Sequence, residues 1–426
     1  MPDVATPSAA FKEMDEEWQL VDDLLGGTET MREAAERWLP RNEQESATAY
    51  QMRLGRSFLF PGFQHTIDTF TGKVFREDID VSRVNARLAE LFKDIDLQGN
   101  DLDAFCTAWF RQGLSHGLSY VLVDHPAQPE GRTLAEEREA GVRPYWVHYS
   151  PRQIIGWRSE TVGGAEVLTR VRIREVVQEY DDEWNDDGGV DQIRVLERGK
   201  YTLYRRNKNE WFVYQDGTTS IDFIPLVPFY AKRTGFMTAS PPLMELAWKN
   251  VEHWQSASEQ RNILHVARVP ILFGRGFRRD DGGDSALGGP GQDVVIGANQ
   301  MLIEESETAD LKWVEHSGQC IAAGKDDLET IKQEMAALGS EILMSRPGSP
   351  TATQDAIEAA QSDSNLVRIV KNFQAAVNTA LRYTGAWIKQ TDVGEVTMTT
   401  QLTVMPTDVP QTGAQPGATP QPRPAA

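Results

Sequence analysis

A serine and a histidine stand side by side in a pattern that resembles a hydrolase motif. The segment Gly113-Leu-Ser-His-Gly117 matches Gly-x-Ser-x-Gly, in which the serine of some hydrolases is the nucleophile. That motif needs a strand, a turn and then a helix. Here a helical pattern precedes the segment and a strand-like run at residues 120–123 follows it. We therefore interpret the segment as a helix-to-strand turn. A cytoplasmic serine hydrolase that uses Ser115 and His116 is the alternative function.

Patterns that bind metals are weak in this sequence. Two acidic stretches, residues 181–187 and 280–284, could hold a divalent ion, but neither has the ligand register of an EF-hand loop. The seven histidines show no His-Glu-x-x-His motif, and Cys106 and Cys320 are the only cysteines. We expect no metal, no cofactor and no disulfide framework, which fits a reducing compartment.

Charge and motifs also limit how the chain could act on nucleic acid. The formal net charge of -20 argues against a general nucleic-acid-binding surface, which would be basic. It does not argue against a passage through which DNA slides. No Gly-x-x-x-x-Gly-Lys-Ser/Thr loop is present, so ATP hydrolysis would be the work of another protein. Residues 1–10 do not resemble a signal peptide, and no run of 18 apolar residues occurs, so we expect assembly in a cytoplasm.

Hydrophobic periodicity predicts an α+β fold for the N-terminal half. Small polar residues predict disorder for residues 1–10. Helical patterns follow at residues 11–39, with a break at 26–28, and at 45–60, 63–75 and 102–114. Short strand patterns then follow one another as an antiparallel β region, at residues 120–123, 145–149, 154–157, 167–177, 193–196, 201–205, 211–214 and 224–230.

The C-terminal half is organised around helices. A helix is expected from Ser240, as N-cap, to about residue 266, and another from 325 to 344. The insert between them, residues 270–314, has strand candidates at 271–273, 294–296 and 301–303. Proline and glycine make residues 345–350 a loop. A helix over 353–389 would be about 50 Å long. A strand at 395–404 and a Pro/Gln/Ala/Thr-rich tail complete the chain.

The order of these elements resembles tailed-phage portal proteins. The run Pro350-Thr-Ala-Thr-Gln-Asp-Ala-Ile-Glu358 is similar to the Thr-Ala-Thr-Glu/Gln signature that follows the portal loop facing the DNA tunnel. Further runs resemble a portal-like family of phage proteins known by an uncharacterised domain, over about residues 45–390. They begin at Ala49, Thr69, Gly117, Arg143, Phe223 and Ser240.

The resemblance implies a portal-like subunit with an α/β wing, a helical stem, a small β-containing clip and a long C-terminal helix. The expected divisions are a disordered N-terminus (1–10), wing (11–239), stem helix (240–268), clip (269–316), stem helix (322–344), tunnel loop (345–352), long wing helix (353–389), short C-terminal strand region (390–405) and disordered tail (406–426). Larger portals add a helical crown, for which this chain has little sequence left.

Particular residues follow from this resemblance. The tunnel loop would contribute Ser345, Arg346, Pro347, Gly348, Ser349 and Pro350 to the DNA passage. The clip, with Arg275, Arg278, Arg279 and Asp280, would be the platform for partners. No residue is assigned a catalytic role, so the chain is not expected to be an enzyme.

The implied function is structural. Twelve copies would form a ring at one capsid vertex of the virion, through which double-stranded DNA enters during packaging and leaves during ejection, without sequence specificity. The implied partners are the terminase large subunit, the major capsid or scaffold protein and a head-tail adaptor, with no membrane. A helical adaptor without a DNA channel is a further alternative.

Overall fold

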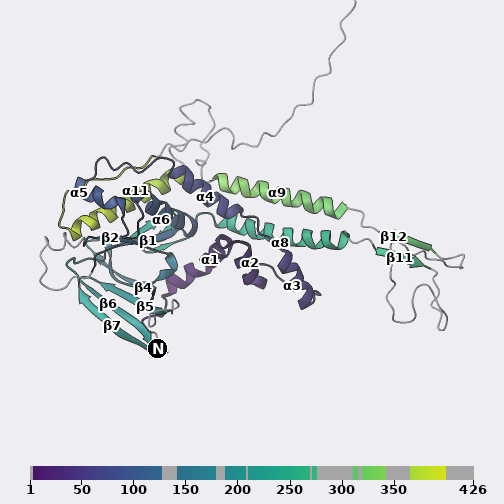
Figure 1. Cartoon of the computed structure of the whole chain (residues 1–426), viewed down its shortest axis with the longest axis horizontal. Helices are drawn as coiled ribbons and strands as arrows, with labels where there is room; N and C mark the ends of the chain where they lie inside the picture. Colours follow the sequence, from purple (N-terminus) through teal and green to yellow (C-terminus); the bar gives the residue numbers. More distant parts are fainter. Residues whose placement is uncertain are drawn as a thin grey trace, which may run out of the picture. The chain divides into compact units, whose positions relative to one another are not determined.

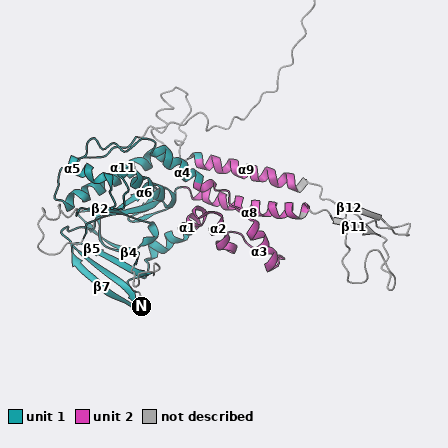
Figure 2. Cartoon of the chain, viewed as in Figure 1, with its two compact units in different colours: residues 1–19, 65–242, 340–426 teal, residues 20–64, 243–339 magenta. Residues whose placement is uncertain are grey.

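The structure is a computed structural model, which describes residues 3–126, 142–178, 188–207, 210–268, 271–275, 310–314, 319–341 and 365–399 (Figure 1). The chain divides into two compact units, shown in two colours in Figure 2. Unit 1 contains residues 1–19, 65–242 and 340–426, and unit 2 contains residues 20–64 and 243–339. Helices and antiparallel sheets are both present, so the predicted α+β class is confirmed.

The centre of unit 1 is a three-stranded antiparallel sheet in the order β2-β1-β8. These strands are Tyr145–Tyr149, Leu118–Asp124 and Leu226–Tyr230. Residues 120–123 of the central strand β1 are a continuous apolar run, and residues 118–123 are all buried, as expected for a strand that neighbours cover on both faces. Two helices pack against this sheet: α6 (Leu102–His116) and α11 (Asn365–Trp387).

An aromatic cluster fills the space between α6, α11 and β8. Its members are Phe75, Trp109, Phe110, Phe229 and Phe373, with ring centroids 4.8–6.3 Å apart. Most of these ring pairs meet edge to face, the arrangement that the aromatic quadrupole favours. Residues that are far apart in sequence therefore share one core.

A five-stranded antiparallel meander forms the second sheet of unit 1, in the order β3-β4-β5-β6-β7. The strands are Ile154–Val162, Ala165–Gln178, Gly189–Glu197, Lys200–Asn207 and Glu210–Thr218. Val171, Ile173 and Leu196 join the core of the three-stranded sheet. Because side chains alternate along a strand, Ile193 and Val195 instead pack against Phe11, Met14 and Trp18 in α1 (Ala9–Leu25).

Shorter elements complete unit 1. They are α4 (Gly62–Val74), which continues from unit 2, α5 (Ala86–Ala89), η2 (Glu90–Lys93), η3 (Pro151–Gln153), β9 (Arg233–Gly235) and β10 (Thr238–Ala239). Within the described residues, 390–399 form an isolated bridge, Asp80 with Thr397, rather than a strand.

Unit 2 is mainly helical. It contains α2 (Gly27–Ala34), η1 (Ala35–Arg37), α3 (Ala47–Arg56), α8 (Met244–Ala267), α9 (Gln319–Glu341) and the hairpin of β11 (Ile271–Arg275) with β12 (Asp310–Val314). Ser46 caps α3 by accepting a hydrogen bond from the Ala49 amide. At the other end of α3, the Ser57 hydroxyl donates to Ser258 Oγ on α8 at 2.8 Å.

Several sequence expectations are wrong in detail. Residues 3–10 are ordered: the Ser8 amide donates to the Ile155 carbonyl, and Val4 and Ala5 pack on the core. Tertiary contacts thus outweigh a polar composition. Ser240 is not the cap of α8, which begins at Met244, because each proline disfavours a helical conformation in the residue before it. The strand expected at 395–404 is absent from the described residues up to 399.

Helix ends also shift. α9 is already helical at Gln319, before the expected 322 or 325, and α11 ends at Trp387 rather than 389. The expected helix end at 344 and helix start at 353 lie outside the described residues. The strand candidates at 294–296 and 301–303 lie outside the described residues, as do residues 353–364 of the expected long helix and the tail at 406–426.

A half-buried histidine in β2, His148, predicts a loss of stability in mild acid. His148 packs near Phe105, and its Nε2 has no hydrogen-bond partner among the described residues. Burial lowers the pKa of His148 to about 4, from an ordinary value of 6.5. The folded state therefore resists protonation more than the unfolded chain. Stability is full above pH 6.5 and falls as the pH drops toward 4, by about 2 kcal/mol at pH 5.

Chemical denaturation at pH 7.5 and pH 5 measures this effect. His148→Phe should flatten the dependence of unfolding free energy on pH, because the titrating ring is gone. His65→Phe is the matched control, since His65 is exposed, and it should keep the wild-type dependence. Equal pH dependence in the two variants would contradict the assignment.

Candidate functional site

Helices α8 and α9 form an antiparallel pair in unit 2. Near one end, Lys249 Nζ lies 2.9 Å from Glu334 Oε2, and near the other Gln260 Nε2 donates to the Ile321 carbonyl at 2.8 Å. Gly324 permits the close approach there, because a methyl group at this position would overlap the Gln260 amide. Two apolar residues of α9, Ile331 and Met335, are buried.

The N-terminal part of unit 2 is tied to α8 by buried polar contacts. Asn250 Oδ1 accepts from the Phe63 amide at 2.8 Å, and its Nδ2 donates to the Phe60 carbonyl at 2.9 Å. The Gln255 amide donates to the Trp38 carbonyl at 2.9 Å. Directional bonds of this kind fix the position of the segment that contains Phe58 and Phe60 beside the helix pair.

A groove of about 490 Å³ opens beside this helix pair. Its walls are mainly apolar, from Phe58, Phe60, Ala257, Leu264, Ile321 and Leu328. Two cationic side chains of the groove lie over its aromatic rings. The Arg261 guanidinium lies 5.8 Å from the Phe58 ring centroid, and Lys332 Nζ lies 5.3 Å from the Phe60 ring centroid. Phe58 is 54% exposed, which is unusual for a phenylalanine beside other apolar groups. This groove could bind an apolar side chain of another protein.

The hairpin β11–β12 is inserted in the chain between α8 and α9. Its strands pair antiparallel from Ile271 with Val314 to Arg275 with Asp310. Of the expected clip residues, Arg275 lies at the end of β11, while Arg278, Arg279 and Asp280 lie outside the described residues. The expected tunnel loop, residues 345–352, also lies outside them.

Ser115 and His116 lie at the C-terminal end of α6, before β1, in the order that the sequence predicts for a structural turn. Ser115 Oγ is 2.8 Å from His116 Nδ1 and bonds the Gln112 carbonyl at 2.9 Å. Both side chains are buried, at 1% and 3% exposure. The pair thus has a hydrogen bond that a nucleophile and base would need, but neither side chain lines either of the pockets described for this structure.

Packing accounts for the two glycines of this segment. A methyl group at Gly113 would overlap the Phe229 ring. Gly117 ends α6 in the left-handed conformation, with φ of 84°, and a side chain there would overlap the Ser240 carbonyl. The resemblance to a hydrolase motif therefore follows from helix termination and close packing.

No group of three or more metal-ligating side chains occurs among the described residues. Likewise, no helix in the described ranges has the length and apolar character needed to cross a membrane.

Sequence reasoning missed the groove. The helix predicted for residues 45–60 is wrong at its end: α3 stops at Arg56 and leaves Phe58 and Phe60 outside it, where only the tertiary structure places them beside α8 and α9. The available signal was the apolar run Phe58-Leu-Phe60 directly before Pro61-Gly62.

Comparisons with known proteins give one family match. The profile of a family described as a domain of unknown function, DUF4055, matches residues 242–388, a segment that includes α8, α9 and α11. No curated protein matches the chain.

Similar solved structures come from gene transfer agent (GTA) particles. A chain in the neck of an empty GTA particle has 12% identity and a TM-score of 0.43, covering 80% of this chain and 81% of that chain. A chain in the virion of a native particle has 13% identity and a TM-score of 0.40, with 86% and 88% covered. A chain in the neck of a native particle has 10% identity and a TM-score of 0.40, with 80% and 81% covered.

Proposed function

We propose that this chain is a structural subunit of a phage head or neck and, more specifically, a portal subunit that forms a ring around a DNA passage. The observation that supports this best is the pair α8 and α9, which flanks an inserted β-hairpin and precedes the long helix α11. This is the stem, clip and long-helix order that the resemblance implies. The matched segment 242–388 spans all of these elements.

Burial of the apolar groove of unit 2 would favour assembly of copies of this chain. Phe58 and Phe60, which line the groove, leave 54% and 38% of their surface exposed in one copy. Burying such side chains stabilises an interface by about 25 cal/mol for each Å² removed from water. When one face of a subunit meets a different face of the next, repeated contacts close into a ring if the rotation allows it. The groove is the face that we assign to the next copy.

We propose the remaining roles on the resemblance to portal proteins. The hairpin β11–β12 and its connecting residues form the clip, to which the terminase large subunit and later a head-tail adaptor bind. The capsid or scaffold protein contacts the wing. Residues 345–352 line the passage, where Arg346 of each copy contributes one positive charge that contacts DNA phosphates. The chain performs no catalysis, and another protein supplies the energy for packaging.

Light scattering coupled to size exclusion tests the ring. Twelve copies of the 47.7 kDa chain give roughly 570 kDa, and negative-stain images should show closed rings. Phe58→Lys should shift the mass toward the monomer while circular dichroism stays unchanged. Phe212→Lys is the matched control, because Phe212 is an exposed phenylalanine of unit 1 and lies outside the groove. A wild-type chain that stays monomeric or dimeric at high concentration would reject the proposal.

A further inference from the structure

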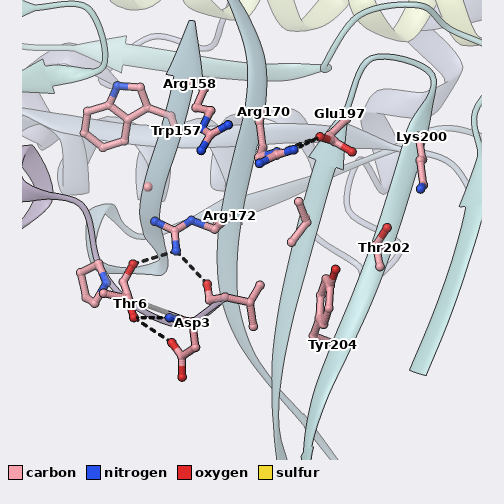
Figure 3. Close-up of a pocket in the computed structure, with 14 residues that line it drawn as sticks. Asp3, Thr6, Trp157, Arg158, Arg170, Arg172, Glu197, Lys200, Thr202 and Tyr204 are labelled. Carbon is pink, nitrogen blue, oxygen red and sulfur yellow. Dashed lines mark hydrogen bonds and ion pairs between the residues drawn. The ribbon is translucent and has the colours of Figure 1, made fainter. Parts of the chain in front are cut away.

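A basic pocket of about 580 Å³ lies on one face of the five-stranded sheet in unit 1 (Figure 3). Arg158 comes from β3, Arg170 and Arg172 from β4, and Lys200 from β6. The N-terminal segment that includes Asp3 and Thr6 forms another wall. The pocket is unexpected in a chain whose formal net charge is -20.

Strand register brings these cations together. Arg158 pairs with Arg170, Arg170 pairs with Glu197, and Glu197 pairs with Lys200 across successive strands. Residues directly opposite each other in antiparallel strands point to the same face, with Cβ atoms about 5 Å apart. Like charges in this position repel unless an anion lies between them.

Arg172 is held in place by the N-terminal segment. Its Nη1 donates to the Val4 carbonyl at 2.8 Å and to the Thr6 carbonyl at 2.7 Å. Its guanidinium lies over Gly156, where any side chain would overlap it. Burial, together with Arg158 and Arg170, lowers the pKa of Arg172. This guanidinium is therefore ordered before any ligand arrives, and carbonyl dipoles rather than a carboxylate hold it.

Cations outnumber anions in the pocket. Glu197 accepts a hydrogen bond from Arg170 Nε at 2.7 Å, and Asp3 accepts one from the Thr6 hydroxyl at 2.8 Å. Arg158 and Lys200 form no ion pair within the described part of the chain. The hydroxyls of Thr202 and Tyr204 add polar groups to the wall. The pocket has the chemistry to bind several carboxylates of one peptide segment.

The chain contains a segment of matching charge. Residues 179–187 read Glu-Tyr-Asp-Asp-Glu-Trp-Asn-Asp-Asp, with six carboxylates in nine residues. This segment connects β4 to β5. We propose that the basic pocket of one copy binds the acidic segment 179–187 of the next copy. This inference rests on the proposed function, because a ring places copies of the chain side by side.

Strand geometry favours a neighbouring copy over the chain's own segment. The cations Arg158, Arg170 and Lys200 lie at the level of the Arg170–Glu197 pair, whereas the segment joins the other strand end, after the Gln178–Gly189 pair. Eight residues of strand separate these levels, about 26 Å. A connection of about ten residues that must return to its start reaches no more than about 17 Å. Joining opposite ends of the sheet in two copies gives a head-to-tail contact, which a ring requires.

Peptide binding tests the pocket without depending on ring formation. The host is the full chain with every carboxylate of residues 179–187 changed to its amide, so that no neighbour competes. A synthetic peptide of residues 178–189 should bind it, more weakly at high salt. The double change Arg158→Glu and Lys200→Glu should weaken binding by about tenfold or more. Neither side chain has a partner among the described residues, so the fold should persist.

Arg198→Glu is the matched control, because Arg198 is exposed on the neighbouring turn and does not line the pocket. It should leave peptide affinity close to that of the host. Equal affinity in the pocket variant and the control, or no binding at all, would overturn the inference even if wild-type rings form. If the wild-type chain never assembles but the pocket still binds the peptide, the portal proposal is rejected. The specificity of the pocket for the acidic segment is then retained.

In the full-length ring, exchanging the charges gives a second test. Arg158→Glu with Lys200→Glu should reduce ring mass at low protein concentration, and the further changes Asp181→Lys and Asp182→Lys should restore it. If the pocket variant loses assembly and the charge exchange does not restore it, the acidic segment does not bind this pocket in the ring.

Discussion

Replacing Arg53 by methionine is expected to lower the free energy of unfolding by about 3 to 5 kcal/mol. Arg53 is almost fully enclosed in unit 2: its side chain is 3% exposed and that of Glu45 is 9% exposed. The guanidinium donates from Nε and Nη2 to the two Glu45 oxygens at 2.8 Å, and from Nη2 to the Pro40 carbonyl at 2.8 Å. Removal of the cation would leave the Pro40 carbonyl without this donor and the Glu45 carboxylate without its counter-ion, with the Asn42 amide at 3.2 Å still donating to it.

Chemical denaturation and hydrogen exchange measure the loss. Exchange should accelerate across α3 and the segment before it, since these bonds join residue 40 to residue 53. Arg83→Met is the matched control: the Arg83–Glu395 pair is exposed at 68% and 58%, so its loss should change stability by less than about 1 kcal/mol. Adding Glu45→Met to Arg53→Met should recover part of the loss, because no buried charge is then left alone. A cost no larger than that of the control would contradict the assigned role.

This pair also predicts a direction of pH dependence. The hydrogen bonds from Arg53 lower the pKa of Glu45 below its ordinary value of 4.5. The pair therefore contributes stability above pH 4.5, and this contribution is lost as the pH falls through the lower, folded-state pKa. Arg53→Met should remove that acid-dependent component.

Regular patterns in the sequence predicted much of the fold. The strands of the five-stranded meander were predicted because alternating apolar residues are separated by turn residues. The strand β12 was missed, since its five residues Asp-Leu-Lys-Trp-Val follow an insert with no clear period. The order in residues 3–10 was missed for another reason: it depends on carbonyl contacts with Arg172, about 166 residues away in sequence.

Side-chain sites were harder to predict than elements. Arg170 and Arg172 alternate along one strand, which places them on one face, but the approach of Arg158 and Lys200 depends on strand register. Register is a tertiary property, because a shift of one residue would send every side chain to the opposite face. The groove beside Phe58 likewise depends on tertiary structure, because its walls come from segments that are distant in sequence. By contrast, the helix-to-strand order around Ser115 could be predicted from sequence, because it depends on local periodicity alone.

Phe373→Ala is the other substitution with a large expected effect, a loss of about 3 to 5 kcal/mol in unfolding free energy. Phe373 lies on α11 with no exposed surface, and its ring centroid is 4.8 Å from Phe229 and 5.0 Å from Trp109. Truncation would remove these contacts and leave a cavity. The rigid rings around it belong to α6, β8 and the segment after α4, and they can close the cavity only partly.

Thermal and chemical denaturation compare this variant with Phe212→Ala, the same change at a side chain that is 45% exposed on β7. The exposed site loses little buried apolar area, so we expect a change within about 1 kcal/mol there. Phe373→Leu keeps most of the volume and should cost less than Phe373→Ala. If alanine at 373 were no more costly than alanine at 212, the aromatic cluster would not be what fixes α11 against β8 and α6. The edge-to-face contacts of the Phe373 ring would then make no measurable contribution to the unfolding free energy of unit 1.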